Sequence, residues 1–223
     1  SGGAILLAGG DLAGTGYASG TDANTTSEMA GVYTSAGVSS GGGDITIRGQ
    51  TGTSASADSA GVYLSQSGAN IQAGGGNISV YSNIPAGTGS SAAVRAFRSS
   101  NGAMSTTGSG TLTINAIVAS TTTANRGAAL FEGSTISTGT GALNVNVTMT
   151  TNGANGFHFS TPQSTLSSTS GNITLTNLTT SYTNTDVFNT LTANTGGTIR
   201  ITSNSPSYSS TALNGAGPVF IEP

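Results

Sequence analysis

Gly171-Asn172-Ile173-Thr174-Leu175 sets out the pattern on which the architecture depends: a glycine and a polar residue, then apolar residues at alternate positions. Alternation with period two is typical of a β-strand that buries one face. The same Gly-x-apolar-x-apolar pattern begins at six glycines: Gly43, Gly76, Gly110, Gly141, Gly171 and Gly197. Successive glycines are 26 to 34 residues apart, and residues 4–7 resemble an earlier, degenerate copy. The chain therefore contains an internal repeat.

Two further apolar positions recur between these copies. A second strand is predicted around the following anchors: Val32, Val62, Val94, Leu130, Phe157 and Val187. A last copy of it is predicted at residues 217–220. A third strand is predicted around another set: Val38, Ile71, Met104, Ile136, Leu166 and Leu191. Each third anchor precedes the first apolar residue of the next copy by 7 or 8 residues, which indicates a fixed geometry.

Three short strands in each repeat predict an all-β fold, a single-stranded parallel β-helix or β-solenoid. We expect about seven coils of roughly 30 residues, which bury their inward residues only when they stack. The predicted inward column of the first strand is Ile45, Ile78, Leu112, Leu143, Ile173 and Ile199. Residues 1–223 would form one β-solenoid domain, and a β-sandwich is the alternative fold.

Loops are predicted between the first and second strands, where the length varies most. This connection contains clusters of Ser, Thr, Asn and Pro, which are typical of loops, at residues 54–57, 121–123 and 204–206. Repeat proteins often bind their partners along an edge made of such loops.

The composition limits the function classes. Only 6% of residues are charged, the net charge is −3 and there is no basic cluster, which disfavours nucleic-acid binding and electrostatic membrane contact. There is no Cys, so neither a disulfide nor a thiolate site is expected. No apolar run approaches the length of a membrane span, so membrane insertion is not expected. No cofactor is predicted.

Several segments resemble a known group of proteins. Residues 41–49, 60–64 and 171–176 are similar to repeats of filamentous-haemagglutinin-like exoproteins and autotransporter passengers. The resemblance covers residues 30–203. It implies a right-handed parallel β-helix, export to the bacterial cell surface or the extracellular space, and a role in adhesion or surface structure. The secretion domain and the translocating barrel of those families are not found in this sequence.

One row of residues is the candidate ligand-binding or interface site. The position after each second-strand anchor holds an aromatic ring, an arginine or a histidine: Tyr33, Tyr63, Arg95, Phe131, His158 and Phe188. If the anchors face inward, these residues form an outward ladder that can stack on sugar rings. The alternatives are packing against a loop or a neighbouring rod, or a place in the core if the faces are reversed.

Three other patterns occur in the sequence. The outward positions Thr46, Ser79, Thr113, Asn144, Thr174 and Arg200 resemble the Thr ladder of an ice-binding solenoid, but Asn144 and Arg200 interrupt it. Asp44, Asn77 and Asn172 follow the turn glycine, where Asn and Asp bond to backbone groups. They do not form a calcium-binding array, so no metal site is predicted. Glu132 and Asp186 lie two coils apart, and no other group supports catalysis by that pair.

The sequence therefore predicts a non-enzymatic structural or adhesive β-solenoid that forms a stiff surface rod or filament. The alternative is a carbohydrate-binding β-helix, with cleavage less favoured than binding. Strand-like sequence occurs close to both ends, so we expect a fragment of a longer passenger, or a processed subunit whose copies stack end to end. The expected partners are other copies of the chain, or a glycan or protein on a host or neighbouring cell.

Overall fold

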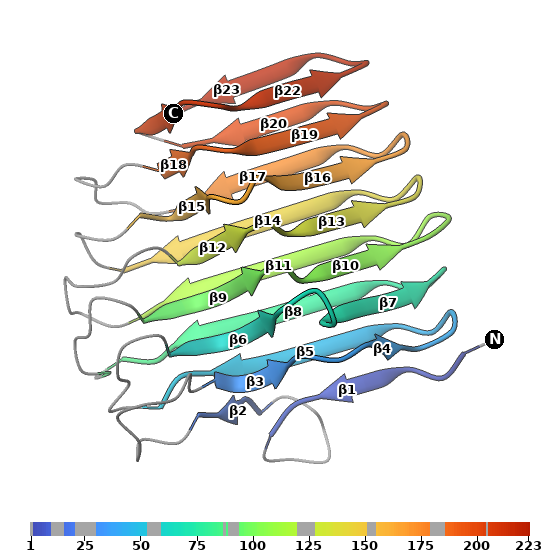
Figure 1. Ribbon diagram of the computed structural model, residues 1–223, viewed down its shortest axis with the longest axis vertical. Coiled ribbons are helices and arrows are strands. Elements are labelled where there is room, and N and C mark those ends of the chain that lie inside the picture. The colour runs from blue at the N-terminus through green and yellow to red at the C-terminus, as the bar shows by residue number, and fades with distance from the viewer. Residues whose placement is uncertain are drawn as a thin grey trace.

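A computed structural model shows the chain as a stack of turns, each of which passes through three parallel β-sheets (Figure 1). The structure describes the following residues: 2–9, 16–20, 30–52, 59–86, 88, 94–119, 128–150, 155–178, 186–203 and 205–223. Within them the regular elements are strands, and every strand pair is parallel. A β-sandwich packs two sheets that are mostly antiparallel, so the sandwich alternative is wrong and the predicted β-solenoid is confirmed.

Each sheet collects the strand that occupies the same place in successive turns. The first sheet has nine strands: β1 (Ile5–Leu7), β5 (Ile45–Gln50), β8 (Ile78–Ile84), β11 (Leu112–Val118), β14 (Leu143–Met149), β17 (Ile173–Asn177), β20 (Ile199–Thr202) and β23 (Val219–Glu222), with β2 (Ala18–Ser19) beside β5. The second sheet has seven: β3 (Ala30–Thr34), β6 (Ala60–Ser65), β9 (Arg95–Ser100), β12 (Ala129–Glu132), β15 (Phe157–Ser160), β18 (Asp186–Phe188) and β21 (Pro206–Tyr208). The third also has seven: β4 (Val38–Ser39), β7 (Asn70–Gly74), β10 (Ala103–Thr106), β13 (Thr135–Thr138), β16 (Ser164–Ser168), β19 (Leu191–Thr195) and β22 (Ala212–Gly215).

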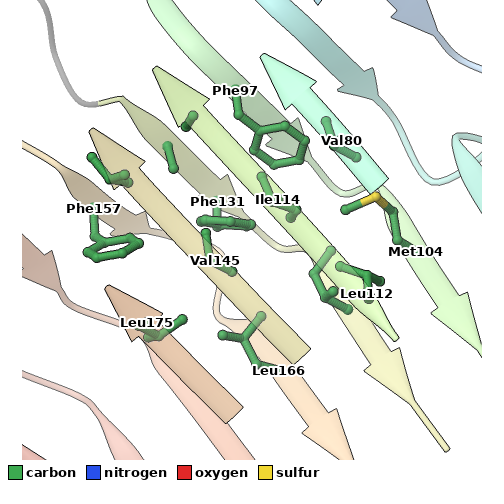
Figure 2. Packing of buried hydrophobic residues seen from close by; sticks show 14 of the residues in the cluster. Val80, Phe97, Met104, Leu112, Ile114, Phe131, Val145, Phe157, Leu166 and Leu175 are labelled. Carbon is green, nitrogen blue, oxygen red and sulfur yellow. The ribbon is translucent and has the colours of Figure 1, made fainter. Parts of the chain in front are cut away.

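The first sheet has the register that the sequence pattern predicts. Ile45 pairs with Ile78, and the column continues through Leu112, Leu143, Ile173 and Ile199. All six side chains are fully buried. A second inward column lies two residues further along these strands and includes Val80, Ile114, Val145 and Leu175, which Figure 2 shows packing against residues of the other two sheets.

The third sheet follows the prediction as far as Leu166 and then departs from it. Val38, Ile71, Met104, Ile136 and Leu166 form one column, but the next member is Ala193 and not Leu191. Leu191 pairs with Ser164 instead. Phe188 pairs with Phe159, and Ala193 pairs with Leu166. The segment from Phe188 to Ala193 is therefore two residues shorter than the equivalent segment of the preceding turn. A shift of two residues leaves Leu191 on the inward face, where it is buried.

The second sheet differs most from the prediction. Its inward column runs Val32, Val62, Phe97, Ala129, Phe157 and Asp186. Val94, Leu130 and Val187 were predicted in this column and are not in it: Val94 precedes β9, and the other two face outward. The connections from the first sheet vary in length, so they do not fix which residue of the second strand faces the core.

The last turn also corrects the sequence analysis. The predicted second-strand copy at residues 217–220 belongs to the first sheet, because Val219 pairs with Ile199. The strand of the second sheet in this turn is β21, and it includes Pro206, which was predicted to lie in a loop. Only residues 203–205 separate β20 from β21. The predicted loops at 54–57 and 121–123 lie outside the described residues.

One corner of each turn explains the glycine of the repeat. Where the third sheet leads into the first, a glycine of each turn lies against the glycine of the turn before it: Gly43, Gly76, Gly110, Gly141, Gly171, Gly197 and Gly217. A Cβ on any of these glycines would lie between 2.1 and 3.0 Å from the carbonyl oxygen of the preceding turn. The glycine is therefore required by the close approach of two backbones.

Buried hydroxyl groups complete this corner. The Thr106 Oγ1 donates a hydrogen bond to the Gly110 carbonyl at 2.6 Å, and the Thr138 Oγ1 donates to the Gly141 carbonyl at 2.7 Å. Ser168 and Thr195 lie at the same place in later turns and also donate to glycine carbonyls. The Gly110 carbonyl thus has one hydroxyl donor and the Gly141 carbonyl has two, and these bonds hold the bend between the two sheets.

We expect Gly141→Ala to destabilise the protein by about 2 kcal/mol or more, because the new methyl group overlaps the backbone of the preceding turn. The nearest atom to a Cβ at this position is the Gly110 carbonyl oxygen, at 2.1 Å. Gly75→Ala is the matched control, since a Cβ there has no neighbour within 4 Å. Urea denaturation followed by circular dichroism measures both variants. Equal midpoints for the two variants would contradict the close-approach explanation.

Candidate functional site

The six residues of the predicted outward ladder do not share one column. The outward column of the second sheet runs Tyr33, Tyr63, Arg98, Leu130, His158, Val187 and Ser207. Only Tyr33, Tyr63 and His158 of the predicted set lie in it. Arg95 pairs with Ala60 at the start of its strand, three residues before the position that Arg98 occupies. The prediction of one continuous ladder is therefore wrong.

Phe131 and Phe188 belong to the core. They share an inward column with Phe159, and all three side chains are fully buried. The rings of Phe131 and Phe159 stack with centroids 4.7 Å apart and an interplanar angle of 9°. Phe159 stacks on Phe188, and Phe188 stacks on Tyr208 with centroids 5.2 Å apart. The alternation in Phe157-His158-Phe159 is the sequence signal for two inward phenylalanines in one strand, and the predicted faces of Phe157 and His158 are correct. The predictions for Leu130-Phe131 and Val187-Phe188 are one residue out of register.

Three residues at the start of the outward column, Tyr33, Tyr63 and Arg98, make contacts between turns. Tyr33 is 46% exposed, whereas Tyr63 is only 3% exposed. The Arg98 guanidinium lies 4.5 Å from the centre of the Tyr63 ring and 3.7 Å from a carboxylate oxygen of Glu132. Ser100 donates a hydrogen bond to Glu132 at 2.7 Å. These contacts connect neighbouring strands, so packing between turns accounts for this part of the predicted ladder.

The polar residues after the corner glycines connect successive turns. The Asn77 backbone N–H donates to the Asp44 Oδ1 at 2.7 Å, and the Thr111 N–H donates to the Asn77 Oδ1 at 2.9 Å. The Thr198 N–H donates to the Asn172 Oδ1 at 3.0 Å. The predicted bonding of Asp44, Asn77 and Asn172 to backbone groups is thus confirmed, and it reaches the next turn. In the described part of the chain, no cluster of three or more His, Asp or Glu could hold a metal ion.

Asp186 is a buried carboxylate with a complete set of partners. It is 1% exposed and accepts a hydrogen bond from the Phe157 N–H at 2.8 Å. The Asn177 amide donates to both carboxylate oxygens, and the Ser203 hydroxyl donates at 2.5 Å. Burial, with a smaller contribution from the charge of Asp186, raises the pKa of Tyr208. These contacts give Asp186 a structural place between strands of the first and second sheets.

Glu132 and Asp186 do not meet in a cleft. Glu132 pairs with Ser160, whereas the Asp186 carboxylate is bonded to the N–H of Phe157, three residues earlier in the same strand. Glu132 is bound to Arg98 and Ser100, and Asp186 lies in the inward column. The two carboxylates therefore do not form the paired arrangement that hydrolysis of a glycosidic bond requires.

The outward face of the first sheet contains the predicted Thr-rich column in register. Thr46, Ser79, Thr113, Asn144, Thr174 and Arg200 pair in sequence. Leu6 precedes them and Phe220 follows. The Arg200 guanidinium lies 4.9 Å from the centre of the Phe220 ring and forms an ion pair with Glu222 at 2.7 Å. The column is thus interrupted by a charged group, and an ice-binding plane requires a regular surface.

A groove on the third sheet is a candidate site that the sequence analysis missed. It has a volume of about 700 Å³ and lies where this sheet bends toward the first. It crosses five successive turns and is lined by Thr106, Thr107, Gly108, Ser137, Thr138, Gly139, Ser167, Ser168, Thr169, Asn194, Thr195 and Asn214. Figure 1 shows the strands concerned, β10, β13, β16, β19 and β22, stacked one above another. The sequence signal was the polar residue directly after each third anchor, as in Ile136-Ser137 and Leu166-Ser167.

Comparisons of the sequence with protein-family models and with curated proteins, and comparison with solved structures, gave no significant match. The described part of the chain also contains no helix with the length and hydropathy needed to cross a bilayer. The resemblance to filamentous-haemagglutinin-like proteins therefore stays a prediction beyond the β-solenoid itself.

We expect Phe131→Ala to lower the free energy of unfolding by about 3–4 kcal/mol, because it removes a ring from the stacked core. Tyr33→Ala should cost about 1 kcal/mol, since this ring is half exposed and makes an edge contact with Tyr63. Chemical denaturation of the two variants tests the corrected register. If Phe131→Ala were as mild as Tyr33→Ala, Phe131 would belong on the surface.

Asp186→Ala should destabilise the protein by about 3 kcal/mol, because it leaves the Phe157 N–H and the Asn177 amide buried without an acceptor. Asp186→Asn keeps one acceptor oxygen and should be milder. The control is Glu222→Ala, which breaks an exposed ion pair and should cost less than about 1 kcal/mol. Thermal melting at neutral pH ranks the three variants. A melting temperature of Asp186→Ala equal to that of Glu222→Ala would contradict this account of the buried carboxylate.

Proposed function

We propose that this chain is a non-enzymatic, stiff rod segment of an extracellular bacterial surface protein that acts in adhesion or surface structure. The observation that carries the proposal is the continuity of the three sheets, which share one core over the whole stack. The resemblance of residues 30–203 to filamentous-haemagglutinin-like repeats supports the extracellular setting.

The direction of the backbone hydrogen bonds explains how such a rod resists deformation. In a β-solenoid these bonds join one turn to the next, so they run along the long axis. Ile45 N–H donates to the Asn77 carbonyl at 2.8 Å, Ile78 to Thr111 at 2.9 Å and Leu143 to Asn172 at 2.9 Å. Bending the rod would require many of these bonds to lengthen together, and the shared apolar columns oppose the same motion.

The described acidic residues favour a structural role over catalysis. Asp44 bonds to the next turn, Glu132 pairs with Arg98, and Glu222 pairs with Arg200. Asp186 is buried among hydrogen-bond donors. A catalytic carboxylate needs access to substrate, and each of these four groups is already engaged in a contact between turns.

The last turn offers a surface for a further turn. Val219 and Ile221 continue the inward columns of the first sheet and are 41% and 51% exposed, and Tyr208 is 38% exposed in the second sheet. A further solenoid turn in register would bury these side chains and pair the free edges of β21, β22 and β23, whichever chain supplies it. A neighbouring copy can do so through the edge of β1, whose inward residues Ile5 and Leu7 are only partly buried. End-to-end association of copies is part of the proposal.

The proposal is tested with the chain in its own organism and with the purified chain. We expect antibodies to label intact cells, and we expect the purified chain to release no reducing ends from a panel of bacterial and host polysaccharides. Light scattering and electron microscopy should show straight particles that lengthen with concentration. Labelling only after permeabilisation would contradict the surface location. Hydrolysis of a polysaccharide would contradict the non-enzymatic role, and particles of constant length would contradict end-to-end association.

A further inference from the structure

The groove on the third sheet has the form of a linear binding site. Its floor includes the outward column Ser137, Ser167, Asn194 and Asn214, one residue from each of four successive turns. Neighbouring strands in a sheet are about 4.8 Å apart, so the five turns that line the groove span roughly 20 Å along the rod axis. A site of this shape fits an extended chain better than a compact molecule.

The chemistry of the lining is uniform. It consists of hydroxyl groups, side-chain amides and glycine backbone, with no charged residue and no aromatic ring. The inward hydroxyls of Thr106, Thr138 and Ser168 are already bonded to corner carbonyls, so they hold the bend beneath this open groove. The outward residues are accessible: Ser137 and Ser167 are half-buried, and Asn194 and Asn214 are exposed.

The amide pair at one end of the groove shows how the outward polar side chains of successive turns bond to one another. The Asn214 Nδ2 donates a hydrogen bond to the Asn194 Oδ1 at 2.9 Å. Each amide carries two donor hydrogens and an oxygen with two lone pairs, so this bond leaves a donor and an acceptor on each residue. Hydroxyls likewise both donate and accept. The groove therefore presents a row of groups that can each give and take a hydrogen bond.

These features select among ligands. A charged polymer would find no counter-charge in the lining, which disfavours nucleic acid and acidic polysaccharide. A peptide strand binds a free sheet edge, whereas the backbone groups of β13 and β16 are bonded to neighbouring strands on both sides. An uncharged chain of hydroxyl groups matches the row in length, polarity and hydrogen-bonding capacity.

We propose that this groove binds an uncharged, linear polysaccharide that lies along the rod axis. The inference rests on the proposed adhesive function and gives it a ligand class and a place. Each turn contributes a similar polar rung, so the affinity grows with the number of sugar units until the groove is filled. Each hydrogen bond to a solvated sugar hydroxyl gives little net free energy, so short oligosaccharides bind weakly. The polymer binds more tightly because the polar residues of several turns contribute together.

The test measures binding of the purified chain to soluble neutral polysaccharides: a β-glucan, a mannan, a xylan and a galactan. Alginate and heparin serve as acidic comparisons. Affinity electrophoresis or calorimetry should show binding to at least one neutral polymer and none to the acidic ones. For the polymer that binds, its oligosaccharides should bind more tightly with each added unit up to the length of the groove. Ser167→Glu places a charged, larger side chain in the centre of the groove and should weaken binding at least tenfold.

The matched control is Thr174→Glu, which makes a similar change in the same turn but on the outward face of the first sheet. It should bind like the unchanged chain, and circular dichroism with a melting curve verifies that both variants are folded. Equal loss in both variants, undiminished binding by Ser167→Glu, or binding of the acidic polymers alone would overturn the proposal. Absence of binding to every polymer would overturn it as well, while surface labelling and the lack of hydrolysis would still support the rod function.

Discussion

Successive backbones approach within contact distance at one corner of every turn, and the rest of the structure depends on this approach. The corner glycines stack so closely that even a methyl group would overlap the carbonyl of the preceding turn. The stack brings β5, β8, β11, β14, β17 and β20 into the same register relative to the corner, and it places Ile45 and its successors in one buried column. The buried hydroxyls next to the glycines then satisfy the carbonyls that the bend leaves inside.

A second close approach limits what the core can hold at the other end of the first sheet. A Cβ on Gly49 would lie 2.1 Å from the Gly61 carbonyl, and the Ser82 hydroxyl donates to the Ala96 carbonyl. The inward positions there are accordingly small or polar in several turns, as in Gly49, Ser82 and Ala116. Large rings occur instead in the second sheet, where the column of Phe131, Phe159 and Phe188 fills the space between the sheets.

The same geometry explains which parts of the fold the sequence could predict. A glycine that admits no substitution marks the start of each first-sheet strand, so period-two alternation after it fixed the inward residues correctly. The second sheet has no such marker. Its strands follow connections of unequal length. A one-residue error in register put Phe131 and Phe188 on the surface, and a three-residue error put Arg95 in the place that Arg98 occupies. Leu191 moved for a related reason, since a shorter turn shifted its strand by two residues.

The polar residue after each third anchor indicates an outward polar row, but the sequence does not show that this row lies in a groove, because hydroxyl residues occur both inside and outside the fold. Thr138 and Ser137 are adjacent and chemically alike, yet one donates to a buried carbonyl and the other faces solvent. The corner assigns these opposite roles: alternation sends one hydroxyl inward to hold the bend, and the neighbouring one outward. Since the bend repeats in every turn, the outward polar residues, which are serine, asparagine or glutamine, repeat with it and align along the rod axis. The polar surface row therefore follows from the same repeated bend that stabilises the stack. A ligand of matching polarity and extended shape can bind along this row.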